Sequence, residues 1–177
     1  MKKIIILIFL LFSFHTSFSQ TIKLDGISFG SGAVIESKEN FLDGGYLELG
    51  YSKIRMQKPS IFYSTGNEFS GKIRFQNSKS GNSLGVVVGY KYHFLGSLLS
   101  VGTDLEYLKS LSSKGGDFNV NPNFQINMFT PQLSVVCAYS INLSSNGNLD
   151  TPGRILLGLR YVHSFKRENS LKNFQSR

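Results

Sequence analysis

The sequence predicts an all-β fold, an up-and-down antiparallel β-barrel of about eight strands behind a cleaved N-terminal signal peptide. Three observations support this prediction. Hydrophobic and polar residues alternate through most of the chain, turn-forming residues separate the alternating runs, and one face combines charged residues with many glycines. With 41% hydrophobic and 17% charged residues, the chain is too apolar to be disordered, and its mean hydropathy of -0.06 argues against a helical membrane bundle. The 177 residues fit one domain, and the single cysteine excludes an internal disulfide.

The N-terminus has the organisation of a secretory signal peptide. Lys2 and Lys3 precede an uninterrupted apolar run, and Ser17 and Ser19 have the spacing of a small-residue cleavage site before Gln20. The apolar run is only about half of the ~20 residues that a membrane-spanning helix needs. We therefore expect cleavage, with an uncleaved anchor as the alternative. The predicted divisions are a signal peptide at 1–19, a barrel at 20–166 and a basic C-terminal tail at 167–177.

After the signal peptide, alternation with a period of two recurs along the chain. In the clearest run, Phe118, Val120, Phe124 and Ile126 alternate with asparagine and glutamine. This period is typical of a β-strand with two different faces. The predicted strands span residues 26–36, 44–56, 61–76, 83–95, 98–109, 118–129, 132–143 and 154–166.

The predicted connections differ in length. Tight turns are expected at Gly96-Ser97 and Thr130-Pro131, and a short one at 57–60. The connections 110–117 and 144–153 are longer and rich in Ser, Gly, Asn and Asp. We therefore expect short and long connections to lie at opposite ends of the barrel.

Two positions disturb the strand pattern. The segment Ser64-Thr65-Gly66-Asn67 resembles a turn and could split the third strand, giving nine strands, although the alternation continues through it. Pro122 removes a ladder donor, so we expect a bulge there or a position beyond any membrane-facing band.

Two kinds of barrel fit eight alternating strands, one soluble with an apolar interior and one in a membrane with an apolar exterior. The residues of the polar face favour the second, because near-balanced charges can pair inside a narrow lumen and glycines leave room for them. Aromatic residues near strand ends add a pattern typical of membrane girdles. The charged residues of that face are Glu48, Lys72, Arg74, Lys91, Asp104, Glu106 and Arg160, and the aromatic residues are Tyr90, Tyr92, Phe94, Tyr161 and Phe165. A secreted soluble β-barrel that binds an apolar ligand is the alternative.

With this signal peptide, strand count and girdle, residues 26–165 resemble the small outer-membrane β-barrels of Gram-negative bacteria, of the OmpA-transmembrane and OmpX kind. The last strand is similar to theirs, since Leu157, Leu159 and Tyr161 alternate toward an aromatic residue, Phe165. The resemblance implies a location in the cell outer membrane, termini in the periplasm, and contacts with outer-membrane lipid, lipopolysaccharide and the barrel-assembly machinery. It implies no activity.

No group of residues in the sequence specifies a reaction. Some outer-membrane barrels deacylate lipid with His, Ser and Glu, so a lipid-modifying enzyme is a further alternative, and His163-Ser164 is its candidate pair. Adjacent strand residues face opposite sides, which separates the two side chains. The other soft ligands, His93 and Cys137, fall on different strands, without the spacing of a metal site. We expect no catalytic, cofactor-binding or metal-binding residues.

The chain is basic, with a formal net charge of +8, and part of this charge lies in the tail. Lys172 and Arg177 could contact lipid phosphates or an anionic partner, or the tail could be an ordinary solvated terminus. Secretion argues against a nucleic-acid partner. We therefore predict a non-enzymatic outer-membrane barrel with a side-chain-plugged lumen and a structural or surface-interaction role.

Overall fold

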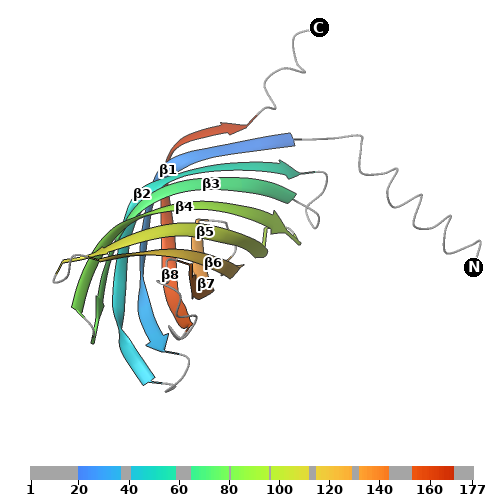
Figure 1. The fold of residues 1–177 in the computed structure, drawn as a ribbon. Helices are drawn as coiled ribbons and strands as arrows, with labels where there is room; N and C mark the ends of the chain where they lie inside the picture. The colour runs from blue at the N-terminus through green and yellow to red at the C-terminus, as the bar shows by residue number, and fades with distance from the viewer. Residues whose placement is uncertain are drawn as a thin grey trace, which may run out of the picture.

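The chain folds into a closed barrel of eight antiparallel strands in which each strand pairs with its neighbours in sequence and β1 pairs with β8 (Figure 1). The computed structural model describes residues 20–36, 41–58, 65–79, 81–95, 97–111, 115–128, 132–143 and 153–169. The strands are β1 (Gln20–Glu36), β2 (Phe41–Lys58), β3 (Thr65–Ser78), β4 (Gly81–Phe94), β5 (Leu99–Ser110), β6 (Gly116–Asn127), β7 (Leu133–Asn142) and β8 (Arg154–Asn169). The predicted all-β up-and-down barrel is confirmed. Within the described part of the chain, no helix is long and apolar enough to cross a membrane.

Several strands are longer than predicted. β1 begins at Gln20, β2 extends to Lys58, and β8 continues to Asn169, which pairs with Ile22 of β1. Polar residues obscure the alternation in these extensions, whereas backbone pairing does not depend on side-chain polarity. The predicted signal peptide at 1–19 and the tail beyond residue 169 lie outside the described residues.

The third strand is not split at the turn-like segment. Gly66 and Asn67 pair with Met56 and Arg55 on one side and with His93 and Tyr92 on the other. Residues 59–64, where this strand was predicted to begin, lie outside the described residues. Eight strands therefore form the barrel.

The two ends of the barrel are less different in loop length than predicted. β3 ends at Ser78 and β4 begins at Gly81, so a tight connection lies at the same end as 111–115 and 143–153. The sequence concealed this turn, because polar residues occupy both faces around Asn77 and Asn82. Loop length alone therefore does not distinguish the ends.

Side chains alternate between the two faces of the wall, and the apolar ones point outward. On β4, Val86, Val88 and Tyr90 are exposed, whereas Lys91 and His93 are buried. Large hydrophobic residues cover the outer face of all eight strands, and the polar and charged residues fill the inner face. This distribution is the reverse of a soluble barrel, so the prediction of an outward apolar face is confirmed and the alternative of an apolar interior is wrong.

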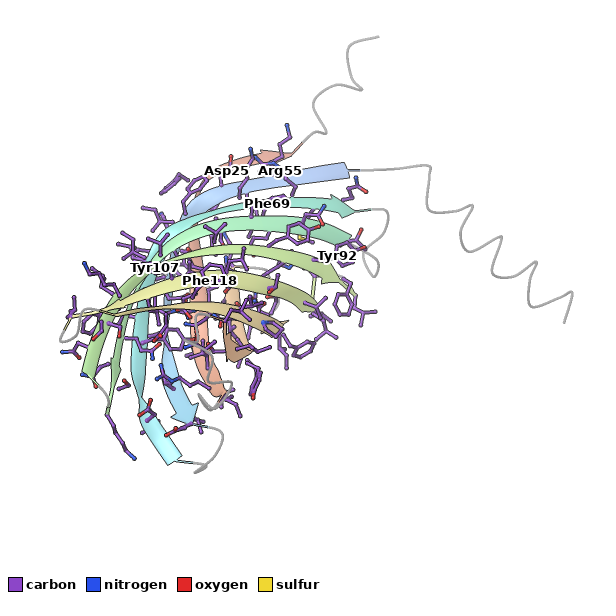
Figure 2. The ribbon with its side chains drawn as sticks, in the orientation of Figure 1. Asp25, Arg55, Phe69, Tyr92, Tyr107 and Phe118 are labelled. Carbon is purple, nitrogen blue, oxygen red and sulfur yellow. The ribbon has the colours of Figure 1, made fainter. Side chains whose placement is uncertain are left out.

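Aromatic side chains lie on the outer wall toward both ends of the barrel (Figure 2). Phe69 contacts Tyr90 with ring centroids 4.9 Å apart, and Tyr92 lies near the same end. Tyr107 and Phe118 pair across β5 and β6 near the opposite end. Aromatic residues toward both ends of an apolar wall are typical of a protein that crosses a bilayer.

The bulge that was expected at Pro122 does not form, so that prediction is wrong. Pro122 lies in the middle of β6 and pairs with Thr103 of β5 in an unbroken ladder. On the β7 side the register is the same before and after the proline, but the pairs in between are missing. The missing donor is accommodated by opening the ladder rather than by inserting a residue.

Candidate functional site

The main feature of the interior is a cluster of five charged side chains from three strands, Glu48, Lys72, Arg74, Asp104 and Glu106. The Arg74 guanidinium donates to the carboxylates of both Glu48 and Glu106. The Lys72 ammonium donates to Glu48 Oε2 at 3.1 Å and to Asp104 Oδ2 at 3.2 Å. All five side chains are buried, and each lies against at least one side chain of opposite charge.

Strand register and glycine together make this cluster possible. Glu48 pairs directly with Arg74 across β2 and β3, whereas Asp104 and Glu106 lie beyond the intervening strand β4. At Gly89, an added Cβ would meet the carboxylate of Asp104 and the hydroxyl of Ser70. A glycine on β4 therefore leaves the space that the longer side chains of β3 and β5 occupy.

Amides and an aromatic ring complete the surroundings of this cluster. Asn119 and Asn121 donate to Glu106 Oε2 at 3.3 and 2.9 Å. The Arg74 guanidinium carbon lies 5.1 Å from the centroid of the Tyr46 ring, within the range of a cation–π contact. The asparagines that alternate along β6 thus serve as hydrogen-bond donors inside the barrel.

A second buried cluster lies closer to the end where β1 begins. Arg160 forms an ion pair with Glu68 and donates to Ser52 Oγ at 2.9 Å. The Lys91 ammonium donates to Gln125 Oε1 at 3.0 Å. Together the two clusters include every charged residue that the sequence placed on the inner face.

The second cluster also contains a hydroxyl, an imidazole and a carboxylate in a row. Ser100 Oγ lies 2.7 Å from His93 Nδ1, and His93 Nε2 lies 3.3 Å from Glu68 Oε2. Asn127 Nδ2 donates to Ser100 Oγ at 2.9 Å, which leaves the serine proton for the imidazole. This order of groups is that of a nucleophile, a base and an orienting acid.

This row of groups was not predicted from the sequence. The tight turn after β4 places His93 directly opposite Ser100, a pairing that could have been deduced from the turn. Ser100, His93 and Glu68 are each 0% exposed, so a substrate could not reach them without displacing other side chains. The Ser100–His93 contact is a hydrogen bond, whereas the His93–Glu68 contact brings opposite charges together only when the imidazole is protonated.

The residues that the sequence singled out for chemistry are not brought together. His163 is exposed on the outer wall between Tyr161 and Phe165, and Ser164 lies on the opposite face. Cys137 is a free, exposed residue of the outer wall. Among the described residues, no group of three or more His, Cys, Asp or Glu side chains is placed to hold a metal ion.

A comparison with protein-family models finds no match to this chain, and neither does a comparison with curated proteins. The solved structures that it matches include the crystal structure of Ail, the attachment invasion locus protein of Yersinia pestis, at 12% identity over 83% of this chain and 100% of that one, with a TM-score of 0.29. They also include the backbone structure of Ail in a phospholipid bilayer nanodisc, at 16% identity over 82% and 100%, with a TM-score of 0.34. Ail in complex with the heparin analogue sucrose octasulfate matches at 13% identity over 83% and 100%, with a TM-score of 0.26. Similarity at this level says nothing about function.

The architecture is established by the features of this chain itself. The barrel is closed, so its strands have no free edge that would leave backbone groups exposed to lipid. Its outer wall is largely apolar, and its interior contains buried, ion-paired side chains. Such a wall is stable in the hydrocarbon of a bilayer and not in water. The chain is therefore a small eight-stranded β-barrel of the cell outer membrane.

Proposed function

We propose that this protein is a non-enzymatic outer-membrane barrel whose lumen is plugged by its own side chains, and that it has a structural or surface-interaction role. The observation that carries the proposal is the two sets of buried ion pairs in the interior, one around Glu48 and Arg74 and the other around Glu68 and Arg160. An eight-stranded barrel encloses a space just wide enough for side chains. Long ion-paired side chains leave no path through that space.

Apolar clusters on both sides of the ion pairs support the proposal. One cluster contains Leu24, Ile54, Met56 and Val162, and the other contains Val34, Tyr46, Ala138 and Leu156. A cavity beside Tyr46, Glu48 and Arg74 measures only about 10 Å³, close to the minimum for a single water molecule. A hydrated ion would therefore have to break several buried ion pairs to pass.

A plugged lumen predicts that the protein does not act as a porin. When the purified barrel is inserted into planar lipid bilayers, we expect no large steady conductance, because ions cannot displace the paired charges. A porin inserted into the same bilayers provides the positive control. Nanosiemens-scale open channels formed by this protein would contradict the plugged lumen.

Because side chains fill the interior, partners can bind only to the outer wall and to the connections between strands. The wall contacts outer-membrane lipid, and lipopolysaccharide and the barrel-assembly machinery are the further partners in this proposal. Phe165, the final-strand aromatic residue, is exposed on the wall. The connection 143–153 is the longest between two strands, and together with 111–115 it is the proposed surface-interaction region.

The row of Ser100, His93 and Glu68 provides a direct test of the non-enzymatic role. Because the serine hydroxyl is buried, we expect the folded barrel to resist labelling by a fluorophosphonate, a reagent that reacts with activated serines. The variant Ser100→Ala is the control for labelling elsewhere. Labelling of the parent that Ser100→Ala abolishes would instead support a lipid-modifying enzyme.

A further inference from the structure

The seam between β6 and β7 is interrupted in the middle of the wall. Val120 pairs with Ile141, and Asn123 pairs with Ala138, but no pairs form at the two positions between them. Both pairs belong to one register, so the strands separate locally without changing their alignment.

Pro122 accounts for this separation. Leu143 N donates to Phe118 O, and Met128 N donates to Leu133 O, each at 2.7 Å. Antiparallel ladders alternate between hydrogen-bonding and non-hydrogen-bonding pairs. Both observed bonds involve even-numbered residues, Phe118 of β6 and Met128 directly after it. Pro122 therefore occupies a hydrogen-bonding position opposite Tyr139. Because proline has no N–H, β6 cannot supply a donor to the Tyr139 carbonyl.

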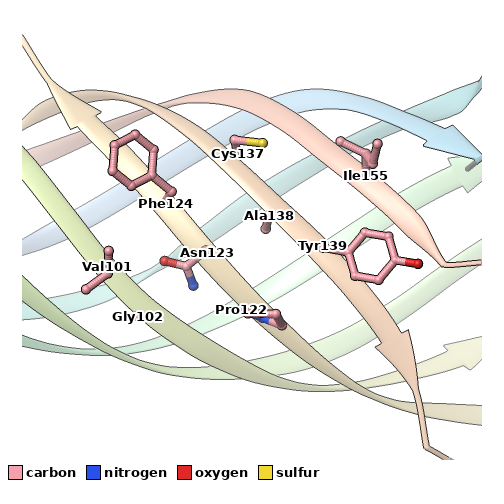
Figure 3. Close-up of a pocket in the computed structure, with 9 residues that line it drawn as sticks. All are labelled: Val101, Gly102, Pro122, Asn123, Phe124, Cys137, Ala138, Tyr139 and Ile155. Atoms are coloured by element: carbon pink, nitrogen blue, oxygen red, sulfur yellow. The ribbon is translucent and has the colours of Figure 1, made fainter.

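A hollow of about 560 Å³ lies at this seam (Figure 3). Its size is within the range of about 300–1,000 Å³ that is typical of small-molecule sites. Four neighbouring strands contribute to it. The lining residues are Val101, Gly102, Pro122, Asn123, Phe124, Cys137, Ala138, Tyr139 and Ile155.

The chemistry of the lining restricts what can fill the hollow. Phe124, Tyr139 and Val101 are exposed on the outer wall, so the hollow is continuous with the surface that contacts lipid. Water needs two to four polar partners. The strongly polar side-chain groups among the lining residues are the Asn123 amide and the Tyr139 hydroxyl, and the other outward side chains are apolar. None of the nine lining residues is charged, so nothing in the hollow selects a phosphate group.

We propose that this hollow is a binding site for one acyl chain of a glycerophospholipid, opened in the wall by Pro122. An empty hollow would deprive its lining atoms of dispersion contacts. An acyl chain from the surrounding bilayer restores them without a polar partner. The site is independent of the ionic interior and of any surface partner.

A single tryptophan can report on lipid at this site, because the chain contains none. The reporter Phe124→Trp lies in the hollow, and Val88→Trp provides a control on β4, where pairing with Gly71 and Leu105 is continuous. Both are reconstituted in vesicles that mix phosphatidylcholine with its acyl-brominated form, which quenches tryptophan. We expect Phe124→Trp to show a roughly threefold higher apparent affinity for the brominated chain, because a chain held in the hollow makes additional carbon contacts.

A second variant distinguishes quenching by a chain in the hollow from quenching that depends only on the depth of the tryptophan in the membrane. Pro122→Val in the Phe124→Trp background restores an N–H opposite Tyr139, and we expect it to close the seam and remove the excess quenching. Coincident quenching curves for Phe124→Trp and Val88→Trp would overturn the proposal. It would also be overturned if the additional quenching of Phe124→Trp were unchanged after Pro122→Val. If Phe124→Trp does not fold, as judged by heat-modifiable gel migration, Tyr139→Trp on the other side of the hollow gives the same test.

Discussion

Replacing Arg74 by methionine is expected to lower the free energy of unfolding by about 3–5 kcal/mol, the cost of removing one partner from a buried ion pair. Arg74 pairs with both Glu48 and Glu106, so the variant leaves two carboxylates in the interior without their guanidinium. Methionine keeps much of the side-chain length, which limits the loss of packing. Urea titration of the barrel reconstituted in lipid vesicles measures the change.

The matched control is Arg55→Met, the same substitution on the outer face. The Arg55–Asp25 pair is at 2.6 Å, and its side chains are 29% and 25% exposed, so we expect a loss of about 0–1 kcal/mol. If the two variants lost equal stability, the interior ion pairs would not support the fold as proposed.

Local patterns in the sequence were sufficient to predict the strands and their two faces. On β4, the alternation of Val86, Val88 and Tyr90 with Gly89 and Lys91 predicts the observed face of every residue, because neighbouring side chains point to opposite sides of a strand. The same alternation predicted that the charged side chains point inward. The fold could therefore be derived without knowledge of any contact between distant strands.

The ion pairs themselves could not be predicted from this pattern. Arg160 and Glu68 are 92 residues apart in sequence, and Lys72 and Asp104 are 32 apart. Whether two such side chains come close to each other depends on the tilt and stagger of the strands in the closed barrel. The alternation along each strand does not determine either quantity. The Ser100–His93 contact is an exception, since it follows from the tight turn alone.

The lipid-facing hollow also could not be predicted from the sequence. The sequence identified Pro122 as a disturbance of the ladder, but the result depends on which residue of β7 lies opposite the proline. Only the register places Tyr139 there, in a hydrogen-bonding position. The inward apolar residues Ile54 and Leu156 were also missed, because they interrupt a face that was otherwise assigned as polar.

Val88→Arg is expected to lower the free energy of unfolding by about 2–4 kcal/mol, the range for arginine at the middle of a bilayer-facing strand. Val88 lies near the middle of β4 and is 59% exposed on the outer wall. The arginine would place a charge in hydrocarbon without a partner. Heat-modifiable gel migration and urea titration in lipid vesicles report the loss.

The comparison of Val88→Arg with Asp104→Asn tests the outward apolar face and the ionic interior most directly. Asp104→Asn removes one interior charge while keeping the side-chain shape, and Lys72 retains Glu48 as a partner, so we expect a smaller loss. Unfolding free energies of both variants and the parent in the same vesicles should therefore rank the parent first, Asp104→Asn second and Val88→Arg last. If Val88→Arg were as stable as the parent while Asp104→Asn failed to fold, the apolar face would point inward and the membrane barrel would be contradicted.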